Sequence, residues 1–275
     1  MKYYYLISGL PDLSFEDTQT AFSVENFTQQ LYEILTKSDK KLVQDLFLRY
    51  DNENLLAFLR DENAVFNAKG TFSQETIADL VQEIKEQKAP RNKKLPPYFN
   101  PFISDFLTGD EALSSLFWED HLATLYYDYL GLSKNAFIRN WATLNLNIHN
   151  VLIALNCRRN GVAHASYIVG NNEVTKNLRT SNARDFELPE IFKQFDQMRH
   201  IDEEANLIEK EYKIDRLRWA WIEEENVFKY FTIERVIGYL LQLQMIERWM
   251  LLHEDSGRQI FKEIVNNLKN IKYGN

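Results

Sequence analysis

The amino-acid sequence predicts an all-α protein built from three helical lobes. Apolar residues recur at the spacing of a helix face through most of the chain. Residues that interrupt helices are scarce, with nine glycines and six prolines among 275 positions. Each proline lies between segments of helical periodicity, where its missing N–H group is tolerated. We therefore expect more than half of the chain to be helical, and no sheet larger than a minor hairpin.

Composition and charge indicate a folded protein and exclude some classes of binding partner. Hydrophobic residues make up 45% of the chain, and 18 Phe, 14 Tyr and 5 Trp are enough to fill a core. The formal net charge of −8 repels nucleic acid and anionic lipid, so neither is expected as a direct partner. The single cysteine, Cys157, excludes an intramolecular disulfide and suits a reducing compartment.

The sequence contains no candidate targeting or membrane-spanning segment. The start has only a short apolar run, interrupted by Gly9 and Pro11, which is not typical of a signal peptide. No run of about 18 apolar residues is present. We therefore expect a soluble, cytoplasmic protein without a transmembrane segment, which reaches a membrane only through a partner.

The first lobe is expected over residues 1–87. Its predicted helices cover residues 24–36, 40–49, 52–61 and 73–87. Ser23 is the expected N-cap of the first of these helices. The tyrosine-rich start is compatible with a short strand or with a helical turn. Residues 88–109 follow as a connector, because their first part is basic and rich in proline.

The second lobe is expected over residues 110–187 and the third over residues 188–275. In the second lobe, apolar stripes predict a helix that ends at Gly131 and another from Phe137 to Leu155. A polar stretch over residues 170–185 is expected to lead into the third lobe. The predicted helices of the third lobe cover residues 189–225, 233–253 and 258–271.

A short internal repeat links the first two lobes. The segment from Asp51 to Arg60 is similar to the segment from Asn147 to Leu155, and each follows an amphipathic helix. Asn54 and Asn150 therefore occupy matching places, as polar residues at the start of an apolar run. We expect the two lobes to superpose with these asparagines at equivalent positions. The alternative is a chance match, because short similarities of this kind are common.

The sequence motifs of catalysis and cofactor binding are absent. There is neither a glycine-rich nucleotide loop nor a Gly-x-Ser-x-Gly elbow. The five histidines are scattered, and none forms a His-Glu-x-x-His or Glu-x-x-His pattern. We therefore expect no enzyme activity, no cofactor and no metal site. A serine or cysteine nucleophile with a distant base stays open as an alternative.

Two pairs of residues are candidate interaction sites. Glu247 and Arg248 interrupt a strongly apolar helix, where an unpaired charge is costly. We expect both to be partly enclosed, each with a polar or charged partner, whereas a surface pair at an interface edge is the alternative. Tyr126 and Tyr127 are either aromatic contacts for a partner or core residues.

Several of these segments together resemble the C-type subunit of the V/A-type ATPase, whose eukaryotic counterpart is the d-type subunit. The resemblance lies in the aromatic helix with Tyr126 and Tyr127, the run from Leu146 to Gly161 with Asn150, the element with Asn54, and the segment from Tyr230 to Leu241 with Glu234 and Tyr239, followed by Glu247 and Arg248. The opening segments Tyr3-Tyr4-Tyr5-Leu6 and Leu10-Pro11-Asp12-Leu13 are similar to those of a bacterial family of unassigned function found near V-type ATPase genes.

The resemblance implies a funnel of three pseudo-repeated helical lobes that acts as a socket. Such a socket lies on the cytoplasmic face of the membrane proteolipid ring, receives the tip of the central shaft and passes torque between them. The implied partners are the central-shaft subunits and the ring. The implied interaction residues are Asn54, Asn150, Tyr126, Tyr127, Glu234, Tyr239, Glu247 and Arg248. The alternatives are a helical adaptor or scaffold unrelated to rotary ATPases, a helical enzyme, and a regulator of nucleic acid.

Overall fold

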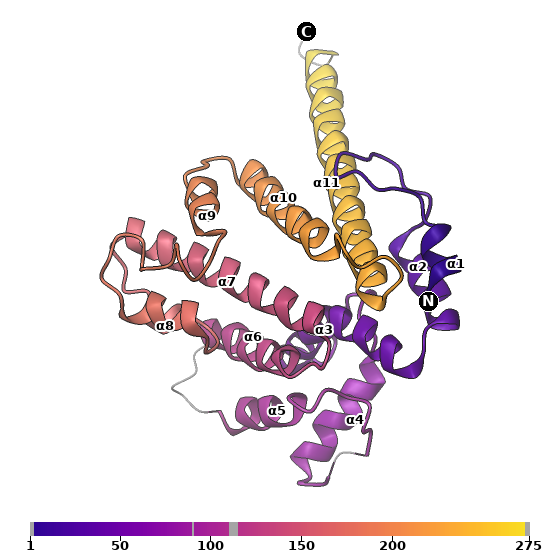
Figure 1. Ribbon diagram of the computed structural model, residues 1–275, viewed down its shortest axis with the longest axis vertical. Coiled ribbons are helices and arrows are strands. Elements are labelled where there is room, and N and C mark those ends of the chain that lie inside the picture. Colours follow the sequence, from indigo (N-terminus) through magenta and orange to yellow (C-terminus); the bar gives the residue numbers. More distant parts are fainter. Residues whose placement is uncertain (1–2, 90, 110–114, 273–275) are drawn as a thin grey trace. The chain divides into compact units, whose positions relative to one another are not determined.

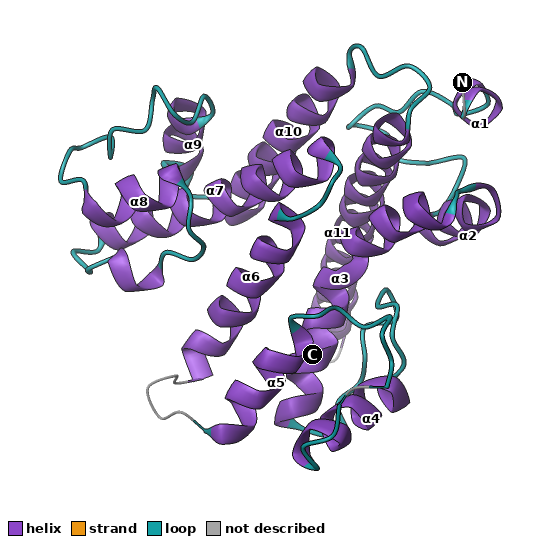
Figure 2. Cartoon of the chain, turned by 60° about the horizontal axis from the view of Figure 1, so that its bottom comes forward, coloured by secondary structure: helices purple, strands orange, loops and turns teal. Residues whose placement is uncertain are grey.

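The computed structural model of the protein describes residues 3–89, 91–109 and 115–272. Over these ranges the chain forms eleven α-helices and one short 3-10 helix, and none of it is β-strand (Figures 1 and 2). The α-helices are α1 (Tyr4–Ser8), α2 (Val24–Ile34), α3 (Lys37–Arg60), α4 (Gln74–Lys85), α5 (Phe99–Thr108), α6 (Ser115–Gly131), α7 (Ala136–Arg159), α8 (Glu173–Thr180), α9 (Phe195–Asp202), α10 (Leu207–Asn226) and α11 (Ile233–Lys272). The expected all-α fold is therefore confirmed, and the tyrosine-rich start is a helical turn.

Packing divides the chain into two compact units. The terminal unit comprises residues 1–40 and 211–275, and the central unit comprises residues 41–210. The boundaries between the units fall inside α3 and α10. The division into lobes over residues 1–87, 110–187 and 188–275 stays a prediction.

One hydrophobic core of the central unit is formed by α3, α4, α5 and α6. Helix α5 contacts both α4 and α6 (Figure 2), and α7 contacts α6, α8 and α9. The fully buried residues of this core are Leu48, Leu55, Ile77, Leu80, Phe99, Phe102 and Ile103. Within one helix these residues recur at helical spacing, which is the periodicity that predicted the helices.

In the terminal unit, α2 packs against α11. Helix α2 begins as expected, because the Ser23 hydroxyl accepts a hydrogen bond from the Asn26 N–H at 3.1 Å. The Phe27 ring of α2 meets the Tyr239 ring of α11 edge to face, with centroids 5.1 Å apart. The N-terminal cap and this aromatic contact together fix α2 on α11.

Two predicted helix ends are wrong. The sequence predicted a break near Asp51 and Asn52, yet α3 is continuous through both. Their side chains hydrogen-bond to groups elsewhere in the central unit, and so they do not compete for the backbone of their own helix. Helix α11 likewise continues through Ser256-Gly257. A glycine inside a helix costs only about 1 kcal/mol, which is too little by itself to end a helix.

The single helix predicted over residues 189–225 is also wrong, because two helices, α9 and α10, occupy this segment. Helix α9 ends at Asp202. The Asn206 side chain accepts hydrogen bonds from N–H groups in the first turn of α10. Lys210 Nζ then bonds to the Asp202 main-chain oxygen at 2.9 Å, which closes the turn between the two helices.

Helices also occupy two segments that were expected as links. Helix α5 lies within the connector over residues 88–109, and α8 lies within the polar stretch over residues 170–185. Pro101 is tolerated in α5 because it lies in the first turn, where N–H groups have no partner inside the helix. Asn172 and Thr175 start α8 with a reciprocal capping box.

Candidate functional site

Asn54 and Asn150 each hold a segment of the central unit by two hydrogen bonds. The Asn54 side chain donates to the Asn67 carbonyl at 3.1 Å and accepts from the Asn67 N–H at 2.7 Å. The Asn150 side chain makes the same two bonds to Val169, at 2.9 Å and 2.8 Å. Both asparagines are buried, and each lies on a helix of 24 residues. We call each arrangement an asparagine clamp.

A second polar residue, three positions before each asparagine, holds the same segment. The Asp51 carboxylate accepts hydrogen bonds from the Thr71 N–H at 2.7 Å and from the Thr71 hydroxyl at 2.9 Å. The Asn147 Oδ1 accepts from Asn172 Nδ2 at 2.9 Å. Asn172 is the N-cap of α8, and Thr71 lies just before Ser73, the N-cap of α4. The two polar residues on each long helix, Asp51 with Asn54 and Asn147 with Asn150, therefore fix the start of the helix that follows.

The two clamps resemble each other in their hydrogen bonds. In both, the side chain of an asparagine on a long helix binds the backbone N–H and the backbone carbonyl of one residue in the following segment. The segments differ in length, because Asn54 binds 13 residues ahead and Asn150 binds 19 residues ahead. Superposition of the whole lobes stays a prediction.

Glycines next to the clamps allow the close approach of the chain. A Cβ on Gly70 would lie 2.4 Å from Asn54 Nδ2. Gly170 follows the clamped Val169 and has φ +76°, a conformation that disfavours other residues. A Cβ on Gly170 would also lie 2.8 Å from a methyl group of Leu146.

Asp45 is a buried carboxylate on α3 that was not predicted from the sequence. It pairs with Lys41 at 2.8 Å and accepts a hydrogen bond from the Tyr129 hydroxyl at 3.0 Å. Burial raises the pKa of the Asp45 carboxyl and that of Tyr129. A cavity of about 500 Å³ beside this group is lined by Asp45, Pro97, Tyr98, Leu125, Asp128, Tyr129, Leu132 and Ser133. The group links α3 to α6 through charge and hydrogen bonding.

Tyr126 and Tyr127 lie on α6, and both are partly buried. The Tyr126 ring packs against the core of the central unit, with its centroid 6.4 Å from that of Tyr98. Burial raises the pKa of the Tyr126 hydroxyl. The rings of Tyr126 and Tyr127 are 5.5 Å apart. Of the two sequence-based alternatives, core packing therefore describes Tyr126, whereas contact of either ring with a partner stays a prediction.

In the terminal unit, Asp215 brings three side chains together around a buried carboxylate. Arg218 pairs with it at 2.8 Å, and Trp249 Nε1 donates a hydrogen bond to it at 3.0 Å. Arg248 forms a further ion pair with Asp215 and lies 3.6 Å from Glu211. Two guanidinium groups and an indole N–H thus compensate the charge of the buried carboxylate.

Glu247 connects α11 to the start of α2. Its carboxylate accepts a hydrogen bond from the N–H of Val24, the first residue of α2, at 3.0 Å. A carboxylate at this position also interacts favourably with the helix dipole. The prediction that Glu247 and Arg248 are partly enclosed, each with a polar or charged partner, is therefore confirmed. Together they join α2 and α10 to α11.

The two remaining candidates, Glu234 and Tyr239, also lie on α11. Glu234 is in the first turn, where a carboxylate is favoured by the helix dipole. Tyr239 is buried, and its hydroxyl has no hydrogen-bond partner within the part of the chain that the structure describes. Burial raises the pKa of this hydroxyl, with smaller contributions from Asp12 and Asp17.

The candidate residues are divided between the two units. Asn54, Asn150, Tyr126 and Tyr127 belong to the central unit, whereas Glu234, Tyr239, Glu247 and Arg248 belong to the terminal unit. Their role as interaction residues stays a prediction.

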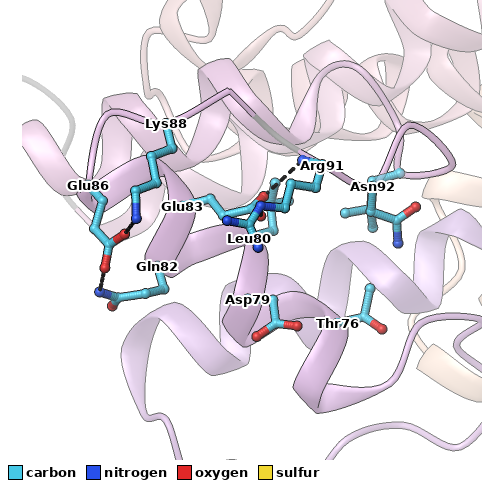
Figure 3. A pocket seen from close by; sticks show the side chains of 10 residues that line it. Thr76, Asp79, Leu80, Gln82, Glu83, Glu86, Lys88, Arg91 and Asn92 are labelled. Atoms are coloured by element: carbon cyan, nitrogen blue, oxygen red, sulfur yellow. Dashed lines mark hydrogen bonds and ion pairs between the residues drawn. The ribbon is translucent and has the colours of Figure 1, made fainter.

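A charged surface hollow of about 370 Å³ lies between α4 and the segment that follows it (Figure 3). Arg91 is held to Glu83 by its backbone N–H, at 3.0 Å, and by its guanidinium group, at 3.5 Å. Lys88 pairs with Glu86. Figure 3 shows both cations pointing toward these carboxylates. The contacts of Arg91 hold the segment against α4. Because each cation has its own counter-charge, the hollow favours no particular ligand.

The described residues offer no site for a metal ion and no span for a membrane. No three His, Cys, Asp or Glu side chains among them lie close enough together to hold a metal ion. None of the helices described combines the length and the apolar character that crossing a bilayer requires.

Asp45 and Asp215 were both missed at the level of sequence, although a signal was present. Asp45 is followed by the buried run from Leu46 to Leu48, and Asp215 follows the buried Ile214. A charged residue inside an apolar helical stripe is the same signal that singled out Glu247 and Arg248. This signal identifies Asp45, whereas the charged neighbours Lys213 and Arg216 obscure it at Asp215.

These contacts define a class of protein: an all-helical chain in which buried polar side chains fasten loops and helix ends. The chain belongs to the family described as "Protein of unknown function (DUF2764)", whose model matches residues 1–271. No curated protein and no solved structure matches the chain.

Proposed function

We propose that the chain is a non-catalytic socket subunit in the central stalk of a V/A-type rotary ATPase, where it couples the rotating shaft to the membrane proteolipid ring. Its partners are the central-shaft subunits and the ring. Through them it is held at the inner face of the cell membrane, on the cytoplasmic side. The role is mechanical, and no bond is made or broken by this subunit.

The observation that carries the proposal is the pair of asparagine clamps. The resemblance to the C-type subunit implies a body built from repeated helical lobes, with Asn54 and Asn150 at matching positions. The two clamps make the same pair of hydrogen bonds on two long helices, and this likeness supports such a repeat. The all-helical fold of the described residues suits the same proposal.

The polar contacts also suit a protein that transmits torque. A coupling body must resist deformation, and buried hydrogen-bond networks restrict loops and helix ends to one geometry. In the central unit the clamps fix the segments before α4 and α8. In the terminal unit Glu247 and Arg248 fasten α2 and α10 to α11.

Direct binding tests the proposal. Purified chain is titrated against purified central-shaft subunits and against the proteolipid ring in nanodiscs, both from the source organism. We expect binding to both, weakened by salt because a socket that releases and re-seats uses charged contacts. Absence of binding to either at micromolar concentrations contradicts the proposal, and the general helical adaptor then takes its place.

A further inference from the structure

Exposed aromatic side chains of the terminal unit are grouped on α1 and on the loop between α10 and α11. We define the aromatic patch as the exposed aromatic residues Tyr4, Tyr5, Phe228 and Tyr230, together with the exposed Val227 and the half-buried Phe231. Phe228 and Tyr230 are 84% and 66% exposed, and Tyr5 is 91% exposed. Single exposed apolar residues are ordinary on protein surfaces, but a group of large ones marks an interaction surface.

The helix and the loop touch through one pair of aromatic rings. The ring of Tyr4 lies 4.8 Å from the ring of Phe231, between centroids, and 5.5 Å from the ring of Tyr5. The Tyr4 ring of α1 therefore contacts the loop that carries Phe228. Tyrosine and phenylalanine are the residue types enriched where proteins bind other proteins, because each provides a large contact area at a low cost in side-chain entropy.

The hydrogen bonding at the two ends of the loop is incomplete. Asn226 Oδ1 and Thr232 Oγ1 are buried and have no hydrogen-bond partner within the described part of the chain. By contrast, the amide oxygens of Asn54 and Asn150 each accept a bond from the segment that follows their helix. A loop whose ends lack such bonds rearranges at low cost when a partner binds.

The neighbouring charges indicate what kind of partner fits. The last turn of α10 carries three carboxylates, Glu223, Glu224 and Glu225, whereas the loop itself carries one cation, Lys229. This acidic surrounding disfavours an anionic lipid surface and favours basic side chains. We infer that the aromatic patch is a docking surface for a protein partner that presents an apolar hollow bordered by lysine or arginine. The inference rests on the proposed function only in expecting this partner to be a rotor subunit.

Photo-crosslinking in living cells tests the surface itself. The photoreactive residue p-benzoylphenylalanine replaces Phe228. In the control variant it replaces Val65 of the central unit, which is 95% exposed. We expect crosslinks from position 228 to a protein peptide that contains lysine or arginine beside apolar residues, at least tenfold above those from position 65. No crosslink from position 228, crosslinks to lipid alone, or equal yields at both positions overturn the inference.

Binding of a variant separates this inference from the proposed function. Phe228→Ser combined with Tyr230→Ser is titrated against the shaft subunits and the ring, with Val65→Ser as the control and helical content checked by circular dichroism. We expect at least tenfold weaker binding of the double variant and unchanged binding of the control. If the wild type binds and the double variant binds equally well, the inference fails while the proposed function stands. If the wild type does not bind the rotor but position 228 crosslinks to another basic protein, the proposed function fails and the inference stands.

Discussion

Replacing Asn150 by alanine removes both hydrogen bonds of the second clamp. The side chain is fully buried, and Val169, to which it binds, is 5% exposed. The variant therefore leaves one backbone N–H and one carbonyl without a partner and away from water. Each such group costs about 1–3 kcal/mol, so the free energy of unfolding is expected to fall by about 3 kcal/mol.

Asn54→Ala is the matched control, because the first clamp makes the same bonds to an exposed residue. Asn67 lies at the surface, and its backbone groups gain water as a substitute partner. The expected loss at Asn54 is therefore only about 1 kcal/mol. The Asn67 carbonyl also keeps a hydrogen bond from the Gly70 N–H at 3.0 Å, so Asn54→Ala leaves fewer backbone groups without a partner than Asn150→Ala does.

Thermal unfolding followed by circular dichroism measures both variants. At about 2–4 °C per kcal/mol for a chain of this size, Asn150→Ala should lower the midpoint by about 6–12 °C. Hydrogen exchange should also show faster exchange at the Val169 amide in the variant, because its acceptor is gone. Equal midpoints for the two variants, or an unchanged exchange rate at Val169, would refute the reasoning.

Other substitutions test separate contacts. Gly170→Ala should lower the thermal midpoint more than Gly161→Ala, because both glycines have positive φ but only at Gly170 would a Cβ contact a neighbouring side chain, at 2.8 Å; equal losses contradict this. Burial raises the pKa of the Asp51 carboxyl, so the folded chain keeps the carboxyl proton to a higher pH than the unfolded chain does. The free energy of unfolding therefore falls as the pH rises from the pKa of the unfolded chain to that of the folded chain. Asp51→Asn should remove this fall, so that urea midpoints of variant and wild type separate as pH rises; parallel pH profiles contradict it. Arg248→Met should cost about 1–3 kcal/mol in urea unfolding, because it removes one of the cations paired with the buried Asp215, and an unchanged midpoint argues against that role.

The parts of the fold that were predicted correctly depend on local signals. Ser23 was identified as an N-cap because it precedes an apolar periodic run, and the hydrogen bond to Asn26 is made within one turn. The enclosure of Glu247 and Arg248 followed from the apolar residues on either side of them in the sequence. Such signals involve neighbours along a helix, which the sequence displays directly.

The parts that were missed depend on partners far away in the chain. Asp51 is typical of a helix end, but its bonds to Thr71, 20 residues on, allow it to lie inside α3. The Tyr129 hydroxyl that binds Asp45 lies 84 residues away. Periodicity shows which face of a helix is buried but not which polar group meets it there. The identities of these contacts therefore required the tertiary structure.

Ion transport in membrane vesicles tests the central claim most directly. Vesicles are prepared from cells that lack the gene and from the parent strain, and ATP hydrolysis and ATP-driven ion uptake are measured on the same preparations. The proposed coupling role predicts that the deletion leaves hydrolysis active but abolishes uptake, and that adding the purified chain restores uptake. Ion uptake that is intact without the chain contradicts the proposed role.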